Sequence, residues 1–534
     1  MTRHQDAEHA RANEVIGCYF IEGAHYRKQD LLRARMRFTA DSSESQVPAN
    51  GHATNIDTVI RALCSYQFAS EGSASSTSAL ELHGYQGEPY YTFQFVGVLV
   101  VHDYVFYVFP KFVRSNYGAN SKFIESSKKA RDFMRLVINV CDKYRMRIGS
   151  GTDDTGFSTR ASKNDTNTAE LYRALLSDYV HDGAYRSRTR VWAHDGNGEI
   201  DWARTLNRTT PYFTQQGAPL YADYWTCERA VDEEALVRRI QLAWVAYAAQ
   251  QFESAELLED VLGFPHALCS VSREAPSDIG TLSFIRTVLI RARNHEFSTR
   301  NCSLINILLL LVDSNEQRRL NSRHAVTHLG TAPFHTVWED ICRALFSDTD
   351  LDSIREQSKP IWHMDGIADE SDAEVAAEHN QLIPDVVCTV SEPVGTVIID
   401  AKYYMPERNA HAISGQPGAY DVVKEYFYQL IADIALQDSG PVLANAFMFP
   451  APYIMENTIP EPTCAIQGSV RFDALGHYEL RRSDETSDER GHFLPIVCAR
   501  LNPLRAFQAY VDSDADDSFD RSKILSKLIQ RSKQ

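Results

Sequence analysis

Two aspartates and a lysine in the last third of the chain lie within otherwise apolar, strand-like runs. The segment reads IPDVVCTVSEPVGTVIIDAKYY, with Asp385 near its start and Asp400 and Lys402 near its end. Side chains at positions i and i+2 of a strand point to the same face, so Asp400 and Lys402 are expected to project together. A hairpin folded about Pro393 would bring Asp385 roughly opposite Lys402.

This combination of charges indicates metal-assisted hydrolysis of a phosphodiester. Buried charge is costly unless it is paired or bound to a metal, and Mg²⁺ is typically held by one or two carboxylates with water and phosphate oxygens. The cation lowers the pKa of a bound water, and a neighbouring ammonium adds charge stabilisation. Two alternatives stay open: a simple salt bridge between Asp400 and Lys402, or a strand edge that faces solvent.

The surrounding pattern predicts elements that could position these residues. We expect a helix, two strands joined by residues 391–395, a long helix and a further strand, over residues 336–346, 383–390, 396–404, 418–437 and 441–449. This order is typical of an α/β unit on a mixed sheet.

The long helix has two distinct faces in this interpretation. Asp421, Lys424 and Tyr428 share one face, and Lys424 and Tyr428 could contact phosphate or DNA. The alternative is an ordinary solvated helix face. The other face is expected to be an apolar stripe of Val423, Phe427, Leu430, Ile431 and Ile434.

The rest of the chain differs from this last third. Residues 90–113 are β-branched and aromatic, with a hairpin break at His102-Asp103. A second hairpin is expected over residues 185–206, because Asp195-Gly196-Asn197-Gly198 suits a tight turn. Helical spacing of apolar residues marks 125–144, 169–179, 233–251, 279–293 and 301–312.

The predicted fold is therefore multidomain α+β, with a β-rich N-terminal region, a helical middle and a C-terminal α/β domain on a mixed sheet. We place the boundaries at 1–150, a domain that could dock a partner; 151–325, a hairpin plus helices; and 326–534, the α/β domain with a C-terminal tail. This division agrees with the usual size of domains.

Composition restricts the function classes further. Hydrophobic residues make up 44% of the 534, enough for real cores, so a disordered chain is excluded. With 54 Lys and Arg against 71 Asp and Glu, the formal charge is −17, so any DNA contact needs local basic patches or a partner. The ten cysteines are scattered without a C-x-x-C pair, as expected for reduced thiols in a cytoplasmic protein. No membrane span is expected, because the most apolar run, 305–312, is too short and fits a buried helix.

At this point the chain resembles a known group of enzymes. It is similar to the PD-(D/E)xK nuclease superfamily and, more narrowly, to LlaJI-type restriction endonucleases, which are relatives of McrC. The resemblance covers roughly residues 90–450. It is carried by FVGVLVV and VFPKF within 95–112, DGNGEIDWARTL at 195–206, VWEDI at 337–341, IPD at 383–385, DAKYY at 400–404 and QPGAYDVVKEYFYQL at 416–430.

The resemblance implies a role for each matching residue. Asp385 and Asp400 would bind Mg²⁺, for which Mn²⁺ could substitute, together with the main-chain carbonyl of Ala401. Lys402 would be the catalytic lysine. Glu339 would be the acid that many such nucleases place beside the metal; the alternative is a carboxylate near a helix N-terminus that interacts with the helix dipole.

The same resemblance implies a DNA endonuclease subunit of a prokaryotic restriction or anti-phage defence system, acting on double-stranded DNA. No G-x-x-x-x-G-K-[ST] motif is found, so a separate AAA+ GTPase of the McrB type is expected to supply any nucleotide hydrolysis. A cognate DNA methyltransferase could belong to the same system. Two alternatives remain: a non-catalytic subunit that stimulates or recruits a motor ATPase or GTPase, and a repair nuclease of the same superfamily. Relatives often have Gln where this chain has Glu425.

Overall fold

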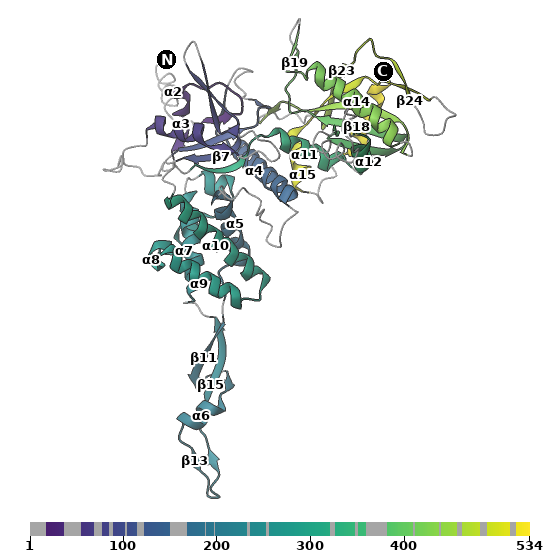
Figure 1. Cartoon of the computed structure of the whole chain (residues 1–534). Helices are drawn as coiled ribbons and strands as arrows, with labels where there is room; N and C mark the ends of the chain where they lie inside the picture. The colour runs from purple at the N-terminus through teal and green to yellow at the C-terminus, as the bar shows by residue number, and fades with distance from the viewer. Residues whose placement is uncertain are drawn as a thin grey trace, which may run out of the picture. The chain divides into compact units, whose positions relative to one another are not determined.

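The computed structural model divides the chain into two compact units (Figure 1). Residues up to 36, 43–163 and 328–534 supply the first, and residues 164–327 the second. The first unit thus contains most of the predicted N-terminal domain together with residues 328–534. The described residues are 18–36, 55–68, 77–84, 89–101, 104–114, 122–149, 168–186, 188–196, 198–231, 235–252, 256–320, 326–347, 351–358, 382–408, 412–436, 439–455, 462–480, 489–512 and 519–534.

A β-sheet forms the N-terminal part of the first unit, in the strand order β10-β1-β8-β7-β16, with β2 paired to β8. The strands are β1 (Cys18–Ile21), β2 (Arg35–Met36), β7 (Val96–Val101), β8 (Tyr104–Phe109), β10 (Phe123–Glu125) and β16 (Val326–Thr331). Every residue of β7 and β8 is buried, which explains their unbroken apolar sequences. The hairpin predicted here is confirmed, since β7 and β8 pair antiparallel; residues 102 and 103 lie outside the described residues.

Strand β16 reaches this sheet at two facing glycines. Gly97 and Gly330 have φ angles of +132° and +142°. A Cβ atom on Gly97 would lie 2.1 Å from the carbonyl oxygen of Leu329, so a larger residue would push the strands apart. The shorter elements of this part are α2 (Lys28–Leu31), α3 (Ile56–Ser65), β3 (Gln67–Phe68), β4 (Thr77–Ser78), β5 (Leu80–His83), β6 (Tyr90–Phe93) and β9 (Val113–Arg114), followed by the long helix α4 (Lys128–Gly149).

The second unit is mainly helical, as predicted. Its helices are α5 (Thr168–Asp182), α7 (Leu236–Gln251), η2 (Glu256–Val261), η3 (His266–Ser270), α8 (Pro276–Ile279), α9 (Leu282–His295) and α10 (Thr299–Leu320). The apolar run 305–312 lies in α10, where Ile305, Leu308 and Leu311 are buried, which confirms the expected buried helix. None of the helices in the described ranges is long and apolar enough to cross a membrane.

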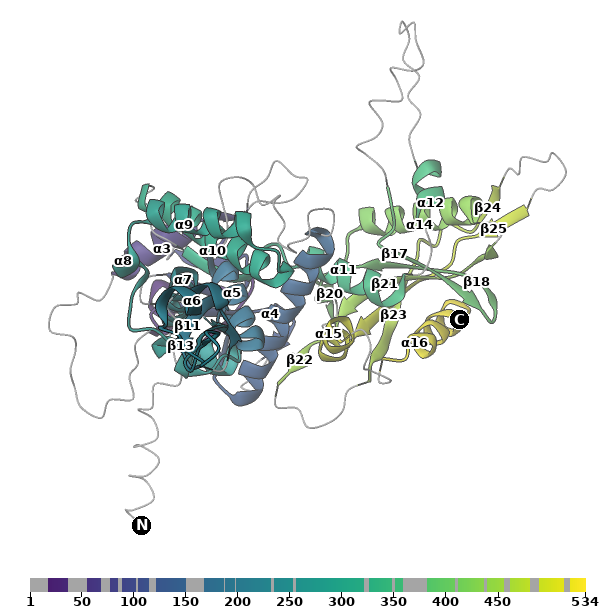
Figure 2. The same cartoon turned by 90° about the horizontal axis from the view of Figure 1, so that it is seen from below.

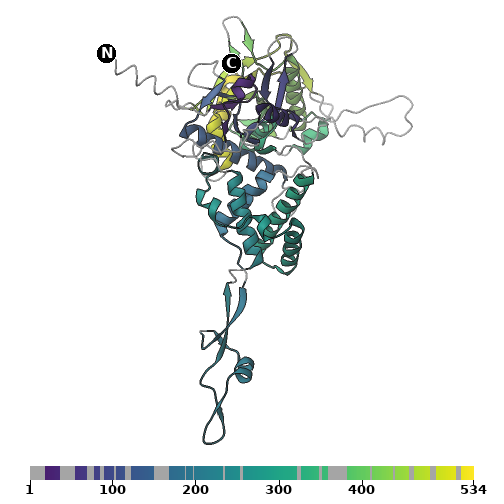
Figure 3. The same ribbon diagram turned by 90° about the vertical axis from the view of Figure 1, so that its left-hand side faces the viewer.

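The hairpin predicted over residues 185–206 is wrong. Strand β11 (Arg188–His194) pairs antiparallel with β15 (Trp225–Val231), and the short β12 (Glu199–Ile200) pairs with the other edge of β15 (Figures 1 and 3). The physical reason is that Asp201 ends β12 by capping α6 (Trp202–Arg208), accepting a hydrogen bond from the Arg204 N–H at 3.0 Å. Strand β15 has seven residues, like β11, and pairs with it along the whole length. A small hairpin of β13 (Tyr212–Phe213) and β14 (Pro219–Leu220) follows α6.

The C-terminal part of the first unit is a mixed sheet, as predicted. Its order is β17-β18-β21-β26-β23, in which β18, β21 and β26 are parallel and the two outer strands are antiparallel to their neighbours. Figure 2 shows α12 and α14 on one side of this sheet and α15 and α16 on the other. The elements are α11 (His335–Phe346), α12 (Asp352–Gln357), β17 (Val386–Ser391), β18 (Val394–Ala401), β19 (Glu407–Arg408), β20 (Ile413–Ser414), α14 (Ala419–Ala435), β21 (Val442–Pro450), β22 (Tyr453–Ile454), β23 (Cys464–Val470), β24 (His477–Leu480), β25 (Glu489–His492), β26 (Ile496–Leu501), α15 (Pro503–Val511) and α16 (Arg521–Ser532).

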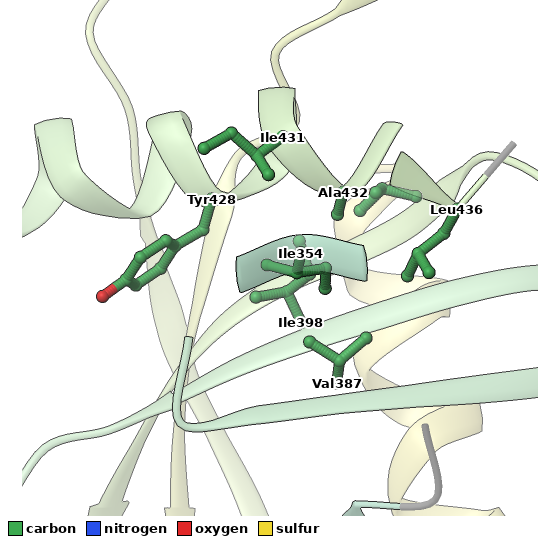
Figure 4. Close-up of a cluster of buried hydrophobic side chains, with 8 residues drawn as sticks. Ile354, Val387, Ile398, Tyr428, Ile431, Ala432 and Leu436 are labelled. Carbon is green, nitrogen blue, oxygen red and sulfur yellow. The ribbon is translucent and has the colours of Figure 1, made fainter. Parts of the chain in front are cut away.

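A compact apolar cluster holds α14 on the sheet. The cluster joins Tyr428, Ile431, Ala432 and Leu436 of α14 to Ile398 of β18, Val387 of β17 and Ile354 of α12. In Figure 4 the ring of Tyr428 lies at one side of this cluster. The buried face of α14 differs from the predicted stripe. Two stripe members, Val423 and Ile434, are 53% and 39% exposed. Besides Ile431 of the predicted stripe, the buried positions include two polar side chains, Glu425 and Gln429, which a purely apolar pattern could not reveal.

Candidate active site

The register of the β17–β18 hairpin determines which charged residues face each other. Val386 is paired with Ile399, and a two-residue turn at Glu392-Pro393 joins the strands. Extending this register places Asp385 level with Asp400. The expectation that Asp385 would lie roughly opposite Lys402 is therefore wrong by two residues, because the hairpin is centred between Glu392 and Pro393, one residue earlier than that pairing requires.

The structure nevertheless brings the three predicted residues together. The Asp385 carboxylate accepts a hydrogen bond from the Ala401 N–H at 3.0 Å. The ammonium of Lys402 lies 2.8 Å from Oδ2 of Asp400. Asp400 is only 2% exposed, so this is a buried ion pair at the end of β18. The main chain is held as well, because the Lys402 N–H donates to the Met448 carbonyl of β21 at 3.0 Å.

A further acid, Asp421, also binds the lysine. Asp421 lies in the first turn of α14, and its Oδ1 is 3.1 Å from Nζ of Lys402. Burial lowers the pKa of Lys402, but the carboxylates of Asp400 and Asp421 outweigh that effect and raise the pKa above its ordinary value. Lys402 is therefore a fixed positive charge in the site.

Three carboxyl groups, those of Asp385, Asp400 and Glu339, lie close enough to influence one another. Burial and then the nearby charges of Asp400 and Glu339 raise the pKa of Asp385 from 3.8 to about 8. Burial and the charge of Asp400 also raise the pKa of Glu339, against the effect of the basic side chains Arg343, Lys402 and Lys424. This mutual repulsion is the electrostatic environment in which a bound cation is favoured.

The position of Glu339 bears on its two interpretations. Helix α11 begins at His335, and no acidic residue lies in its first turn. A dipole interaction falls off within the first turn, so the alternative that Glu339 acts through the helix dipole is not supported. The electrostatic influence of Asp400 on Glu339 is consistent with an acid that faces the same site.

The two residues predicted to contact DNA are placed differently. The ammonium of Lys424 lies 5.2 Å from the centre of the Tyr428 ring, and Lys424 is partly exposed. Tyr428 is only 1% exposed and belongs to the apolar cluster below α14. A buried side chain cannot reach a DNA strand, so the prediction that Tyr428 contacts DNA is corrected.

Glu425 is a buried acid that the sequence analysis did not assign to the site. It is completely buried, and no described residue forms a hydrogen bond with either of its carboxylate oxygens. Burial, followed by the charges of Asp400 and Asp385, raises its pKa well above the ordinary value. A charged residue inside an apolar helical pattern is the signal that could have identified it.

The donor set for a metal is small. In the described part of the chain, no three His, Cys, Asp or Glu side chains are grouped closely enough to hold a metal ion. The binding of a metal by the carboxylates of Asp385 and Asp400 and by the main-chain carbonyl of Ala401 stays a prediction.

The chain has relatives among restriction enzymes. Residues 95–476 match the model of the LlaJI restriction endonuclease family, so the chain belongs to that family and the resemblance seen in the sequence is confirmed. A similar protein is the "Type II restriction enzyme BsuMI component YdjA" of Bacillus subtilis (strain 168), 26% identical over 387 residues, which are 72% of this chain and 76% of that protein. A solved structure of Thermococcus gammatolerans McrB AAA+ hexamers with bound McrC contains a similar chain, with 13% identity and a TM-score of 0.37, over 93% of this chain and 98% of that one.

Proposed function

We propose that this chain is the Mg²⁺-dependent DNA endonuclease subunit of a prokaryotic restriction or anti-phage system, and that its C-terminal part has the PD-(D/E)xK fold. Its reaction would be hydrolysis of phosphodiester bonds in double-stranded DNA. One observation carries the proposal: Asp385, Asp400 and Lys402 meet at one end of the β17–β18 hairpin. Membership of the LlaJI restriction endonuclease family supports the same class of reaction.

The residues of this site fit a hard divalent cation. Asp385, Asp400 and the carbonyl of Ala401 offer oxygen donors, and Mg²⁺ commonly takes one or two carboxylates and keeps several waters. The raised pKa of Asp385 supports the assignment, because burial is the largest cause of the shift and a cation would relieve the repulsion by Asp400 and Glu339 that adds to it. When bound, Mg²⁺ or Mn²⁺ supplies a water of lowered pKa and a positive charge beside the phosphate.

The side chains of the chain itself have separate tasks in this proposal. The ammonium of Lys402, held between Asp400 and Asp421, stabilises negative charge that develops on the phosphate. Glu339 adds a carboxylate at the edge of the cation site. Lys424, which is partly exposed, contacts the DNA backbone, where a lysine acts as a point charge without reading sequence.

We also propose that cutting requires other subunits. The similar Bacillus subtilis protein is described as a component of a type II restriction enzyme, and this supports a multi-subunit system here. The expected partner is an AAA+ GTPase of the McrB type, and a DNA methyltransferase would protect the host's own sites.

The test is nicking of supercoiled plasmid by the purified full-length chain, with Mg²⁺ or Mn²⁺, with and without the candidate GTPase and GTP. Asp400→Asn and Lys402→Met should each reduce cutting at least a hundredfold, in line with the loss of charge stabilisation at a reacting phosphate. Asp473→Asn is the matched control, because the Asp473 side chain is 89% exposed, and it should cut normally.

Two results would contradict the proposal. Undiminished cutting by Asp400→Asn or Lys402→Met would remove the assignment of this site. Absence of cutting by the wild-type chain under all conditions, together with faster GTP hydrolysis by the partner, would favour a non-catalytic interaction subunit.

A further inference from the structure

The residue that follows the proposed catalytic lysine is anchored by the N-terminal sheet. The hydroxyl of Tyr403 donates a hydrogen bond to Oε2 of Glu22 at 2.5 Å. Glu22 directly follows β1, and its N–H continues the pairing of that strand by donating to the Phe109 carbonyl at 2.8 Å. The Lys111 N–H donates to the Tyr403 hydroxyl at 3.2 Å and to Glu22 Oε2 at 3.3 Å. The Tyr403 hydroxyl, the Glu22 carboxylate and the Lys111 N–H are therefore all hydrogen-bonded to one another.

The ring of Tyr403 is fixed on several sides as well. The ammonium of Lys111 lies 4.2 Å from the ring centre, a favourable distance for a cation–π contact. Phe334 lies 5.5 Å away and Phe112 6.3 Å away, centre to centre. Tyr403 is 6% exposed, so neither its ring nor its hydroxyl can move without disturbing a partner.

Two contacts hold the chain around Lys402, one at its own N–H group and one at the side chain of the next residue, Tyr403. On one side, the Lys402 N–H is held by the Met448 carbonyl at 3.0 Å. On the other, Tyr403 is bound to Glu22. Strand β18 ends at Ala401, and the Lys402 N–H makes the last hydrogen bond of its pairing with β21, so these two contacts hold the chain at the point where it leaves the sheet.

We propose that Tyr403 and Glu22 are positioning residues for the lysine of the nuclease site, so that the N-terminal sheet is a working part of that site. This inference rests on the proposed function. In this proposal the N-terminal sheet contributes to the nuclease site itself, in addition to any role in docking a partner. It determines where the ammonium of Lys402 lies relative to Asp400, and a small displacement there is sufficient to slow a reaction strongly.

The experiment compares single-turnover cleavage by the full-length chain, with its GTPase partner where that is required. Tyr403→Phe keeps the ring and its packing but removes the hydroxyl, and Glu22→Gln keeps an oxygen that can accept the hydrogen bond. Tyr403→Phe should lower the cleavage rate at saturating DNA by about tenfold to a hundredfold. DNA affinity and Mn²⁺ affinity should stay within about twofold of wild type. Glu22→Gln should retain most of the rate, and Glu22→Leu should resemble Tyr403→Phe.

The matched control is the ion pair between Arg114 and Glu407, 2.6 Å apart. It joins strand β9 of the N-terminal part to β19 of the C-terminal part but does not contact Lys402. Arg114→Ala should therefore leave the cleavage rate near that of wild type. Thermal unfolding of every variant separates a slower site from a smaller folded fraction, and the double variant Glu22→Leu/Tyr403→Phe removes both polar partners in case either single variant unfolds.

The outcomes distinguish this inference from the proposed function. If Lys402→Met stops cutting but Tyr403→Phe and the double variant cut at the wild-type rate, the positioning role is wrong and the nuclease assignment stands. An equal loss of cleavage rate in Arg114→Ala and Tyr403→Phe would also overturn the positioning role. The rate would then depend on any contact between the N-terminal and C-terminal parts and not on the contact beside Lys402. If Lys402→Met cuts normally, the proposed function itself fails.

Discussion

Replacement of Asp385 by Asn should stabilise the metal-free protein at alkaline pH and change little at acidic pH. Burial and the charges of Asp400 and Glu339 raise the pKa of Asp385 from 3.8 to about 8. Between these values the folded protein retains a proton that the unfolded chain has released. The free energy of unfolding therefore decreases as the pH rises through this window, and the contribution of Asp385 is most favourable below about pH 4.

The size of the effect follows from the same shift. About four pKa units correspond to about 5 kcal/mol, at about 1.36 kcal/mol per unit. Asn has no charge, yet its side-chain oxygen can still accept the hydrogen bond that Ala401 donates to Asp385 at 3.0 Å. We therefore expect the variant to gain up to about 5 kcal/mol above about pH 8 and close to nothing near pH 4.

Urea unfolding in the presence of a chelator, over a series of pH values, measures this difference directly. Asp473→Asn removes an acid whose side chain is 89% exposed, and its pH dependence should match that of wild type. Added Mn²⁺ should stabilise the wild-type protein most at high pH and the Asp385→Asn variant much less. Parallel pH profiles for wild type and Asp385→Asn would show that Asp385 is already ionised in the folded protein, and the argument from crowded carboxylates would fail.

Three further substitutions test the packing that supports the site. Gly97→Ala should lower the free energy of unfolding by more than about 2 kcal/mol, measured by urea unfolding, because its Cβ would lie 2.1 Å from the Leu329 carbonyl oxygen; unchanged stability would mean that β7 and β16 separate easily. Trp338→Phe should cost about 1–3 kcal/mol, since it removes the 3.1 Å hydrogen bond from the buried indole to the Met448 carbonyl, and a thermal melt equal to wild type would contradict this. Asn502→Ala should cost about 1 kcal/mol, measured by the same melts, because Asn502 caps the N-terminus of α15; no loss would indicate that water replaces the cap.

Local patterns in the sequence predicted many of the elements around the site. The apolar runs of β7 and β8, the helices of the second unit and the mixed C-terminal sheet all follow from side-chain periodicity and turn residues, which act over a few positions. Asp385, Asp400 and Lys402 could be assigned for the same reason, because each stands out against its own strand. The roles given to them remain predictions.

Features that depend on distant residues could not be predicted in this way. The partner of Asp385 could not be predicted either, because moving the centre of the turn by one residue moves the partner by two. Strand β11 pairs with β15, more than thirty residues further along the chain, and not with β12, which ends where α6 begins. The contact between Glu22 and Tyr403 joins positions 381 residues apart, and no local pattern in either segment indicates the other.

The charges around Lys402 connect these observations with the formal charge of −17. Two carboxylates, Asp400 and Asp421, face the single ammonium of Lys402, and any ionisation of Asp385 or Glu339 beside them adds negative charge. A DNA phosphate that approached this end of β18 without a cation would meet an excess of negative charge. A divalent ion held by the same acids would reverse that balance. Binding of the cation and of DNA should therefore be positively coupled, and each should raise the affinity for the other by the same factor.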